Sequence, residues 1–174
     1  LPGGMGRLPE ALVASGRFSV RRDTVVRAVR RSKAGFEVSV STSAGPGWER
    51  ADDVIVATPP AAAAKLLTDV APRAASELAQ IESASMAIIT LVVPLNAVAG
   101  LAGSGFLVPP SESLGIKAST FSWAKWDWVR AAGEGEVAVL RASWGRHREE
   151  AALQRTDEEL IDATRRDLAA AVGL

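Results

Sequence analysis

The fold depends on one uncharged stretch, Ser85-Met-Ala-Ile-Ile-Thr-Leu-Val-Val-Pro-Leu95. It belongs to a longer segment, residues 83–111, that contains no charge before Glu112, and residues 84–103 are apolar enough to be weighed as a membrane helix. Proline and glycine interrupt that window, however, and its most apolar part is β-branched and about the length of a strand. We therefore expect a buried β-strand followed by a loop.

Beyond this strand the sequence continues as strands separated by loops. Strand patterns occupy residues 105–108, 114–122 and 136–144, and we expect an antiparallel sheet of at least five strands. The chain then ends in a helix. Thr156 and Glu159 form a capping box, and the apolar positions that follow share one helical face, so a helix is predicted from about residue 157 to 172.

Before the apolar strand the patterning is mixed. A short helix is predicted at residues 7–15, because Leu8 and Leu12 share a face and Gly16 can end it. Strand signals then follow closely and predict an antiparallel meander; they lie at residues 18–20, 24–29, 35–41 and 48–50. Residues 54–57 are a short apolar run of the kind buried on both faces of a parallel sheet.

Two further helices are predicted at residues 60–67 and 73–81, the first opened by Pro59-Pro60. The architecture changes near Ser83, from mixed strands and helices to antiparallel strands with helices. The fold class is therefore α+β, with two domain segments, residues 1–82 and 83–174.

The composition excludes several classes of protein. Of the 174 residues 48% are apolar and 23% are charged, which is typical of a globular chain. Twenty basic residues balance twenty acidic ones, so the positive field that nucleic-acid binding needs is absent and no nucleic-acid partner is expected. The chain has no cysteine and therefore no disulfide, thiolate nucleophile or cysteine metal site.

Few side chains suggest catalysis. Gly3-Gly4-Met5-Gly6 resembles part of a dinucleotide fingerprint, but no strand precedes it and Pro9 stands where the last glycine would be. His147 lies in a charged surface-like stretch, and Ser104 lacks the strand and helix of a nucleophile elbow. We expect no catalytic side chain and no metal site in this chain.

The region around residues 116–128 is the most distinctive. It is rich in tryptophan, which indicates either a hydrophobic cluster at one end of the sheet or a binding platform. Strand alternation places Lys117, Ser119 and Phe121 on one face, with Ile116, Ala118 and Thr120 on the other. Lys117 is then either a ligand for an anion or a solvated surface lysine.

Five motifs together resemble one enzyme family, the FAD-dependent protoporphyrinogen and coproporphyrinogen oxidases of the flavin amine oxidase superfamily. They are Gly3-Gly4-Met5-Gly6-Arg7-Leu8-Pro9-Glu10-Ala11-Leu12, Val26-x-x-Val29, Asp53-Val-Ile-Val-Ala-Thr-Pro-Pro60, Gly103-Ser-Gly-Phe-Leu-Val-Pro109 and Ala118-Ser-Thr-Phe-Ser-Trp-Ala-Lys-Trp126. The first three occur across the superfamily, whereas the last two narrow the resemblance to the porphyrinogen enzymes.

The resemblance implies roles for particular residues. Residues 1–82 would be part of a Rossmann-like FAD-binding domain, in which Val26 contacts the adenine side of FAD through its backbone. Residues 83–174 would be part of the substrate-binding domain, with Leu107 against the macrocycle and Lys117 lining the pocket. Ser119 and Phe121 are expected to join them, because alternation places them on the face of Lys117.

The same resemblance implies a function for a longer parent protein. The family's Gly-x-Gly-x-x-Gly turn and second FAD segment are not found here, so the chain resembles a central fragment that would be inactive alone. The parent would oxidise coproporphyrinogen III or protoporphyrinogen IX with oxygen in haem biosynthesis, in the cytoplasm or at a membrane surface. Two alternatives remain open at this stage: another flavin amine oxidase or desaturase, and an inert folded module.

Overall fold

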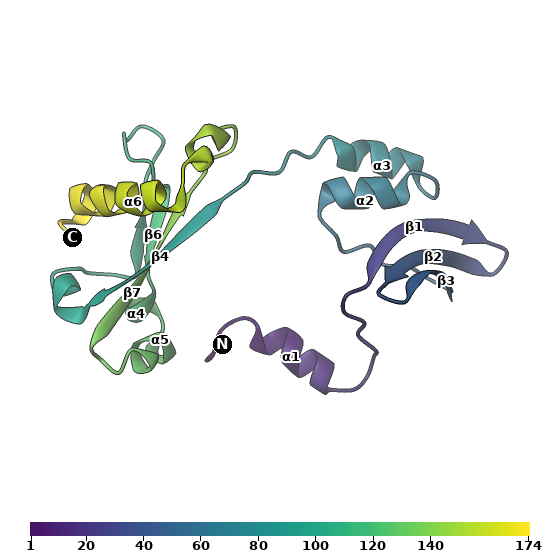
Figure 1. Cartoon of the computed structure of the whole chain (residues 1–174), viewed down its shortest axis with the longest axis horizontal. Helices are drawn as coiled ribbons and strands as arrows, with labels where there is room; N and C mark the ends of the chain where they lie inside the picture. Colours follow the sequence, from purple (N-terminus) through teal and green to yellow (C-terminus); the bar gives the residue numbers. More distant parts are fainter. The chain divides into compact units, whose positions relative to one another are not determined.

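The computed structural model describes residues 1–174, which form an α+β chain divided into two units (Figure 1). One unit is Ala11–Glu82, and the other is Ser83–Leu174 together with Leu1–Glu10. Helix α1 (Arg7–Ala14) spans the boundary between the units and ends before Gly16, which has a φ of +66°. The α+β class is confirmed.

The unit Ala11–Glu82 contains the predicted meander. Strands β1 (Val25–Ser32), β2 (Gly35–Thr42) and β3 (Gly45–Ala51) pair antiparallel in the order β1-β2-β3. Helices α2 (Pro60–Leu67) and α3 (Pro72–Ala79) follow, each with proline in its first turn, where the missing N–H costs nothing.

The core of this unit is small. Buried valines from β1 and β2 and buried alanines from α2 and α3 make it, and α2 packs on both β1 and α3. At its surface the Arg21 guanidinium donates hydrogen bonds to the Glu49 carboxylate, and these bonds lower the pKa of Glu49. Alanine lets α2 and α3 approach closely, which explains the alanine-rich sequence here.

Two local predictions for this unit were wrong. Residues 18–20 form no strand, and neither do residues 54–57. In the second segment Ile55 is 93% exposed, the opposite of a strand buried on both faces. A strand exists only through its neighbours' hydrogen bonds, and this chain places no strand beside residues 54–57.

The unit Ser83–Leu174 is built on a second antiparallel sheet, with strand order β4-β7-β6-β5. Its strands are β4 (Ala87–Pro94), β5 (Gly105–Leu107), β6 (Ala118–Phe121) and β7 (Val137–Trp144). The decisive apolar stretch is therefore a strand, β4, as predicted. No helix in the structure has the length and apolar character needed to cross a membrane.

Helical segments complete this unit. They are the 3₁₀ turns η1 (Leu95–Val98) and η2 (Glu150–Gln154), the short helices α4 (Ser122–Lys125) and α5 (Asp127–Ala132), and the long helix α6 (Asp157–Val172). The predicted capping box is present, because Thr156 Oγ1 accepts from Glu159 N and Thr156 N donates to Glu159 Oε2. The left-handed Gly173 ends the helix.

The predicted number of strands was wrong, since the sheet has four strands rather than five or more. Residues 114–117 do not extend β6 as a regular strand. A carboxylate from α6 accepts the amide protons of Gly115 and Ile116, so these two groups are withdrawn from sheet pairing. The strand therefore begins at Ala118.

Burial alternates strictly along the strands of this sheet. β4 alternates between half-buried and exposed residues, and β6 and β7 alternate between buried and more open ones. Helix α6 lies along one side of the sheet in Figure 1, and its buried residues Leu160, Ala163 and Leu168 pack in the same cluster as Trp144 and Ala142. One face of the sheet is therefore covered, and the other is not.

Trp144 anchors α6 to the sheet. Its ring is 2% exposed, and its Nε1 donates a 2.8 Å hydrogen bond to Thr164 Oγ1. Thr164 Oγ1 in turn donates to Leu160 O at 2.7 Å. The only polar atom of the indole is thus satisfied inside the core, so the ring can be buried without an unpaired donor.

The other tryptophans divide between core and surface. Trp123 is buried with Phe121 and Leu140 in a second cluster, whereas Trp126 and Trp128 remain exposed. The tryptophan-rich region is therefore partly a hydrophobic cluster, which was one of the two interpretations of the sequence.

Replacing Gly115 tests the packing around Trp144. A Cβ at Gly115 would lie 2.2 Å from Cη2 and Cζ3 of Trp144, a ring that its hydrogen bond to Thr164 holds in place. We expect Gly115→Ala to lower the free energy of unfolding by about 1–3 kcal/mol, because overpacking forces the ring or the loop to move.

Urea unfolding followed by tryptophan fluorescence measures the change. Gly100→Ala is the matched control, since no atom lies within 4 Å of its Cβ position, and it should change stability by less than about 0.5 kcal/mol. Equal stability of the two variants would contradict the packing described.

Candidate functional site

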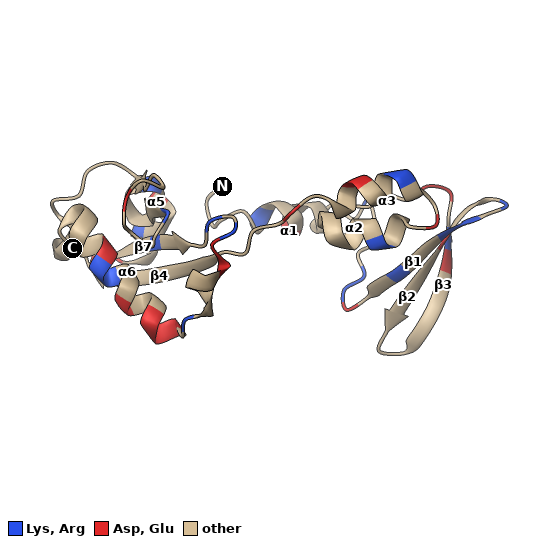
Figure 2. Ribbon diagram, turned by 90° about the horizontal axis from the view of Figure 1, so that it is seen from above, with Lys and Arg blue, Asp and Glu red and all other residues tan.

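The uncovered face of the second sheet is the candidate site. Cross-strand register shows which residues share it: Leu107 pairs with Ala118, Ala118 with Ser143, and Ser143 with Ile88. The next row contains Gly105, Thr120, Arg141 and Thr90, and beyond it Val139 pairs with Val92. This open face is mostly apolar and carries no acidic residue. In Figure 2, β4 is uncharged along its whole length.

Leu107 projects from the open face. It is 83% exposed, an unusual position for a leucine at the end of a strand. Gly105, two residues earlier, has a φ of +137°, and a Cβ there would lie 2.2 Å from Ser119 O. Glycine at 105 therefore lets β5 approach β6 closely, which gives the Gly103-Ser-Gly-Phe-Leu motif a structural reason.

Arg141 is the single cation of the open face. It is exposed in the middle of β7 and lies between Thr90 of β4 and Thr120 of β6 in the cross-strand register. Sequence reasoning missed it. Alternation in residues 137–144 groups Arg141 with Val139 and Ser143, but only the pairing of strands and the position of α6 reveal that this face stays open.

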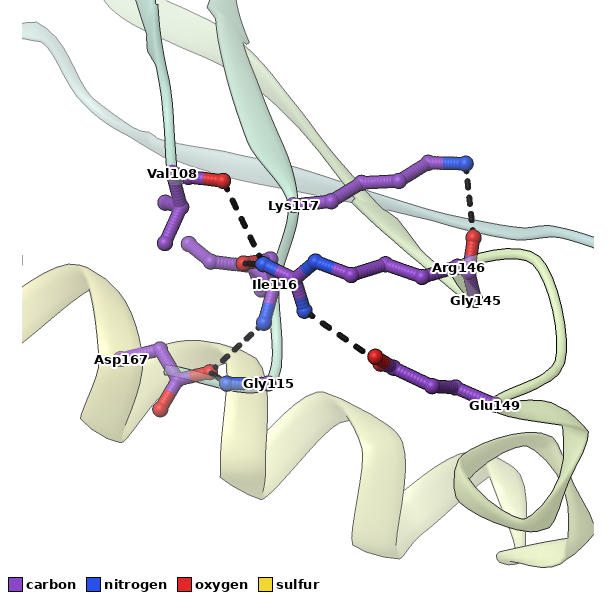
Figure 3. A network of polar contacts seen from close by, with 8 residues as sticks. All are labelled: Val108, Gly115, Ile116, Lys117, Gly145, Arg146, Glu149 and Asp167. Carbon is purple, nitrogen blue, oxygen red and sulfur yellow. Dashed lines mark hydrogen bonds and ion pairs between the residues drawn. The ribbon is translucent and has the colours of Figure 1, made fainter. Parts of the chain in front are cut away.

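Lys117 lies just before β6, at the edge of the sheet. Its Nζ donates a 2.7 Å hydrogen bond to Gly145 O, and its side chain is half-buried (Figure 3). Its backbone is held on both sides, because Lys117 N donates to Ser143 O and Lys117 O accepts from Val108 N. The predicted anion ligand thus already has one protein partner.

A polar network fixes the loop that carries Lys117 (Figure 3). Asp167 Oδ2, from α6, accepts from Gly115 N at 2.9 Å and from Ile116 N at 3.0 Å. Arg146 Nη2 donates to Val108 O and Ile116 O, and Arg146 Nη1 lies 3.7 Å from Glu149 Oε2. The loop is therefore tied to α6 and to the segment after β7.

The structure separates the predicted substrate residues. Ser119 and Phe121 are 2% and 3% exposed, and their cross-strand partners Ala142 and Leu140 belong to the covered face. Phe121 packs edge-on against Phe106 and beside Trp123. Leu107 lies on the opposite face. Alternation had identified the shared face of Ser119 and Phe121, and the structure adds that the core covers this face.

Ser119 has one further property. Its Oγ is buried and has no hydrogen-bond partner in the structure. A buried hydroxyl without a partner is destabilising by about 1–3 kcal/mol. It does not point into the open face, so it adds nothing to the candidate site there.

Val26 lies in the other unit, on β1, the edge strand of the meander. Its side chain is 41% exposed, and the register shifts between Val26 and Ala28, which leaves Arg27 as a bulged residue. An edge strand has backbone N–H and C=O groups without a neighbour, and a bulge interrupts the ladder further. The backbone near Val26 therefore has groups outside the strand ladder, and its contact with a cofactor stays a prediction.

The remaining candidates from the sequence are peripheral. His147 is exposed, and Ser104 O accepts a hydrogen bond from Phe121 N, which is a structural contact. No group of three or more histidine or acidic side chains in the structure could hold a metal ion.

The chain is similar in sequence to a family of known proteins. The family model for flavin containing amine oxidoreductases matches residues 1–173. The chain is 37% identical over all 174 residues to coproporphyrinogen III oxidase of Mycobacterium tuberculosis strain H37Rv, and covers 36% of that protein. It is 34% identical over 170 residues to coproporphyrinogen III oxidase of Mycobacterium leprae, again 36% of that protein.

A solved structure is also similar. A crystal structure of a protein assigned as a protoporphyrinogen oxidase, from Exiguobacterium sp. 255-15, matches 98% of the chain with a TM-score of 0.79 and 27% identity. The chain covers 36% of that protein. It thus spans about a third of the length of each of these relatives.

The loop network leads to a stability prediction. Asp167→Ala leaves the Gly115 and Ile116 amides without their acceptor, and both bonds are partly buried. We expect the free energy of unfolding to fall by about 1–3 kcal/mol, the usual penalty for leaving such donors unpaired.

Asp162→Ala is the control on the same helix, because Asp162 is exposed and makes no such bonds. It should leave stability within about 0.5 kcal/mol. The measurement is again urea unfolding, and a loss shared equally by both variants would show that the carboxylate bonds are not responsible.

Proposed function

The chain belongs to the flavin containing amine oxidoreductase family, and from this premise we propose that it is the central third of an oxidase that converts coproporphyrinogen III to the porphyrin. The observation that carries the proposal is the open, apolar, acid-free sheet face with Leu107 standing on it, 83% exposed. The names of the mycobacterial relatives supply the substrate. Activity is assigned to the full-length protein and not to the 174-residue chain alone.

The open face would form one wall of the substrate site. A porphyrinogen is a large apolar macrocycle with carboxylates at its rim, so its wall should be apolar and free of acids. Leu107, Val139 and Ile88 provide the apolar surface. The face has no carboxylate, so nothing on it would repel the carboxylates of the substrate. Leu107 is the residue that we assign to the macrocycle.

The flavin would be FAD, held in part by Val26. The edge position of β1 and the bulge after Val26 leave backbone groups for such a contact, so the residues present fit one side of a flavin nucleotide. A bound flavin supplies hydride acceptance, with oxygen as the proposed final acceptor. No Gly-x-Gly-x-x-Gly turn for a pyrophosphate occurs in this chain.

The chain's own residues would bind and position the substrate and not transfer protons. The open face has no histidine and no acid, so it offers no general base to a bound molecule. Its apolar side chains would exclude water from the covered side of the macrocycle. In this proposal the residues of this chain accelerate the reaction by orienting the substrate.

Lys117 is a second proposed substrate contact. An ammonium has three protons, and one is given to Gly145 O, so two remain for a carboxylate. Lys117→Met would test this contact in the assay below. A direct contact of the substrate with Ser119 or Phe121 would require the core around these two residues to open.

The proposal is tested by measuring porphyrin fluorescence as the purified full-length protein oxidises coproporphyrinogen III, with protoporphyrinogen IX as the alternative substrate. We expect turnover of coproporphyrinogen III and about one flavin per protein. The 174-residue chain, purified in parallel, should bind little flavin and show no activity, because it lacks a pyrophosphate site.

Two results would contradict the proposal. Oxidation of amines with no porphyrinogen turnover would favour another flavin amine oxidase. A stoichiometrically yellow, active 174-residue chain would show that the site is complete within these residues.

A substitution at Leu107 tests the assignment of the open face. Leu107→Ser should raise the KM for porphyrinogen about ten- to a hundredfold, since burying a leucine against a ligand contributes about 1.5–3 kcal/mol. Stability should hardly change, because the side chain is 83% exposed.

Ile161→Ser is its control. Ile161 is 40% exposed on α6, which covers the other face of the sheet, so its substitution should leave KM unchanged. KM values that rise equally in both variants would remove Leu107 from the substrate wall.

A further inference from the structure

Arg141 stands out because it is a cation without a partner. No hydrogen bond or ion pair joins its guanidinium to another residue of the chain. The other arginine of this sheet region, Arg146, is by contrast bonded to Val108 O, Ile116 O and Glu149. Arg141 therefore has all of its donors available.

The surroundings of Arg141 favour one kind of ligand. Across the strands it has Thr90 and Thr120, and along β7 it has Val139 and Ser143, so hydroxyl groups flank it and no acid shares its face. A guanidinium binds a carboxylate through two parallel hydrogen bonds, and neighbouring hydroxyls can donate to the same oxygens. An apolar floor strengthens such a contact because it reduces competition from water.

The distance between Arg141 and Leu107 also suits the width of a macrocycle. Leu107 lies on β5, two strands away from β7 and one row further along the open face. With strands about 4.8 Å apart and residues about 3.3 Å apart along each strand, the two backbones are separated by about 12 Å. This distance is comparable with the width of a tetrapyrrole and its substituents, so a ring resting on Leu107 would bring its rim to Arg141.

We propose that Arg141 binds a rim carboxylate that a tetracarboxylate porphyrinogen has and a dicarboxylate one lacks, and so selects the more carboxylated substrate. This inference rests on the proposed function. With the tetracarboxylate, the guanidinium exchanges water for a carboxylate. With the dicarboxylate, an uncharged substituent would cover an unpaired cation, which is unfavourable. Selectivity therefore arises from both a gain and a penalty.

The experiment uses the full-length protein with Arg141→Gln, and measures both turnover and equilibrium binding of coproporphyrin III and protoporphyrin IX by fluorescence. We expect KM and Kd for the tetracarboxylate to rise about ten- to a hundredfold, as for loss of a charge-assisted hydrogen bond. KM and Kd for the dicarboxylate should instead fall slightly, by no more than about threefold, because the unpaired cation is removed. The kcat should be little changed, because Arg141 positions the rim and not the reacting carbon.

Two further variants sharpen the test. Arg141→Lys keeps the charge but loses the paired donors, so it should recover part of the selectivity. Arg166→Gln, an exposed arginine on α6 away from the open face, should leave both substrates as in the wild type. Raising the salt concentration should weaken tetracarboxylate binding in the wild type more than in Arg141→Gln.

The outcomes separate the two proposals. Equal changes for both substrates, or no change for either, would overturn the role of Arg141 while the wild-type enzyme still oxidises coproporphyrinogen III. A wild-type protein that oxidises no porphyrinogen would instead overturn the proposed function. If Arg141→Gln proves unfolded in a thermal melt, Arg141→Lys alone decides, because wild-type selectivity in that variant would exclude a paired guanidinium contact.

Discussion

The hydrogen bond from Trp144 Nε1 to Thr164 Oγ1 is the interaction on which the second unit depends. It joins the last residue of β7 to the middle of α6 inside the core, where neither group has access to water. Burying an indole without a partner for its N–H would leave a polar donor unpaired in the core, which is costly. By fixing α6 on one face of the sheet, this bond also decides which face remains open.

The pairing of the strands determines which side chains lie on the covered face and which lie on the open face. Side chains alternate, so a one-residue slip would exchange the two sets of residues completely. Leu107 and Arg141 are on the open face only because β5, β6 and β7 pair as they do, with Gly105 allowing the closest approach. The network of Asp167 and Arg146 holds the loop before β6 and so resists such a slip.

The open face of the second sheet exposes several large apolar side chains, among them Leu107, Val92 and Ile88. Large exposed apolar surfaces mark sites of interaction. The chain spans about a third of its relatives' length. Under the proposed function, the open face is the surface that the substrate covers. The edge strand β1, with its bulge near Val26, is a second proposed contact surface, in the other unit.

The sequence by itself determined the local elements of this protein. Apolar runs, proline positions and the capping box at Thr156 identified β4, α2 and α6, because these signals act within a few residues. The motifs also identified the family.

Residues 54–57 were misjudged because a strand needs neighbours that local patterning does not reveal. Alternation grouped Ser119 with Phe121 and Arg141 with Val139, but it could not tell which group faces the core. Only the packing of α6, α4 and η1 against the same face of the sheet, fixed by contacts between residues far apart in the chain, decided that Ser119 and Phe121 are buried and that Leu107 and Arg141 are not.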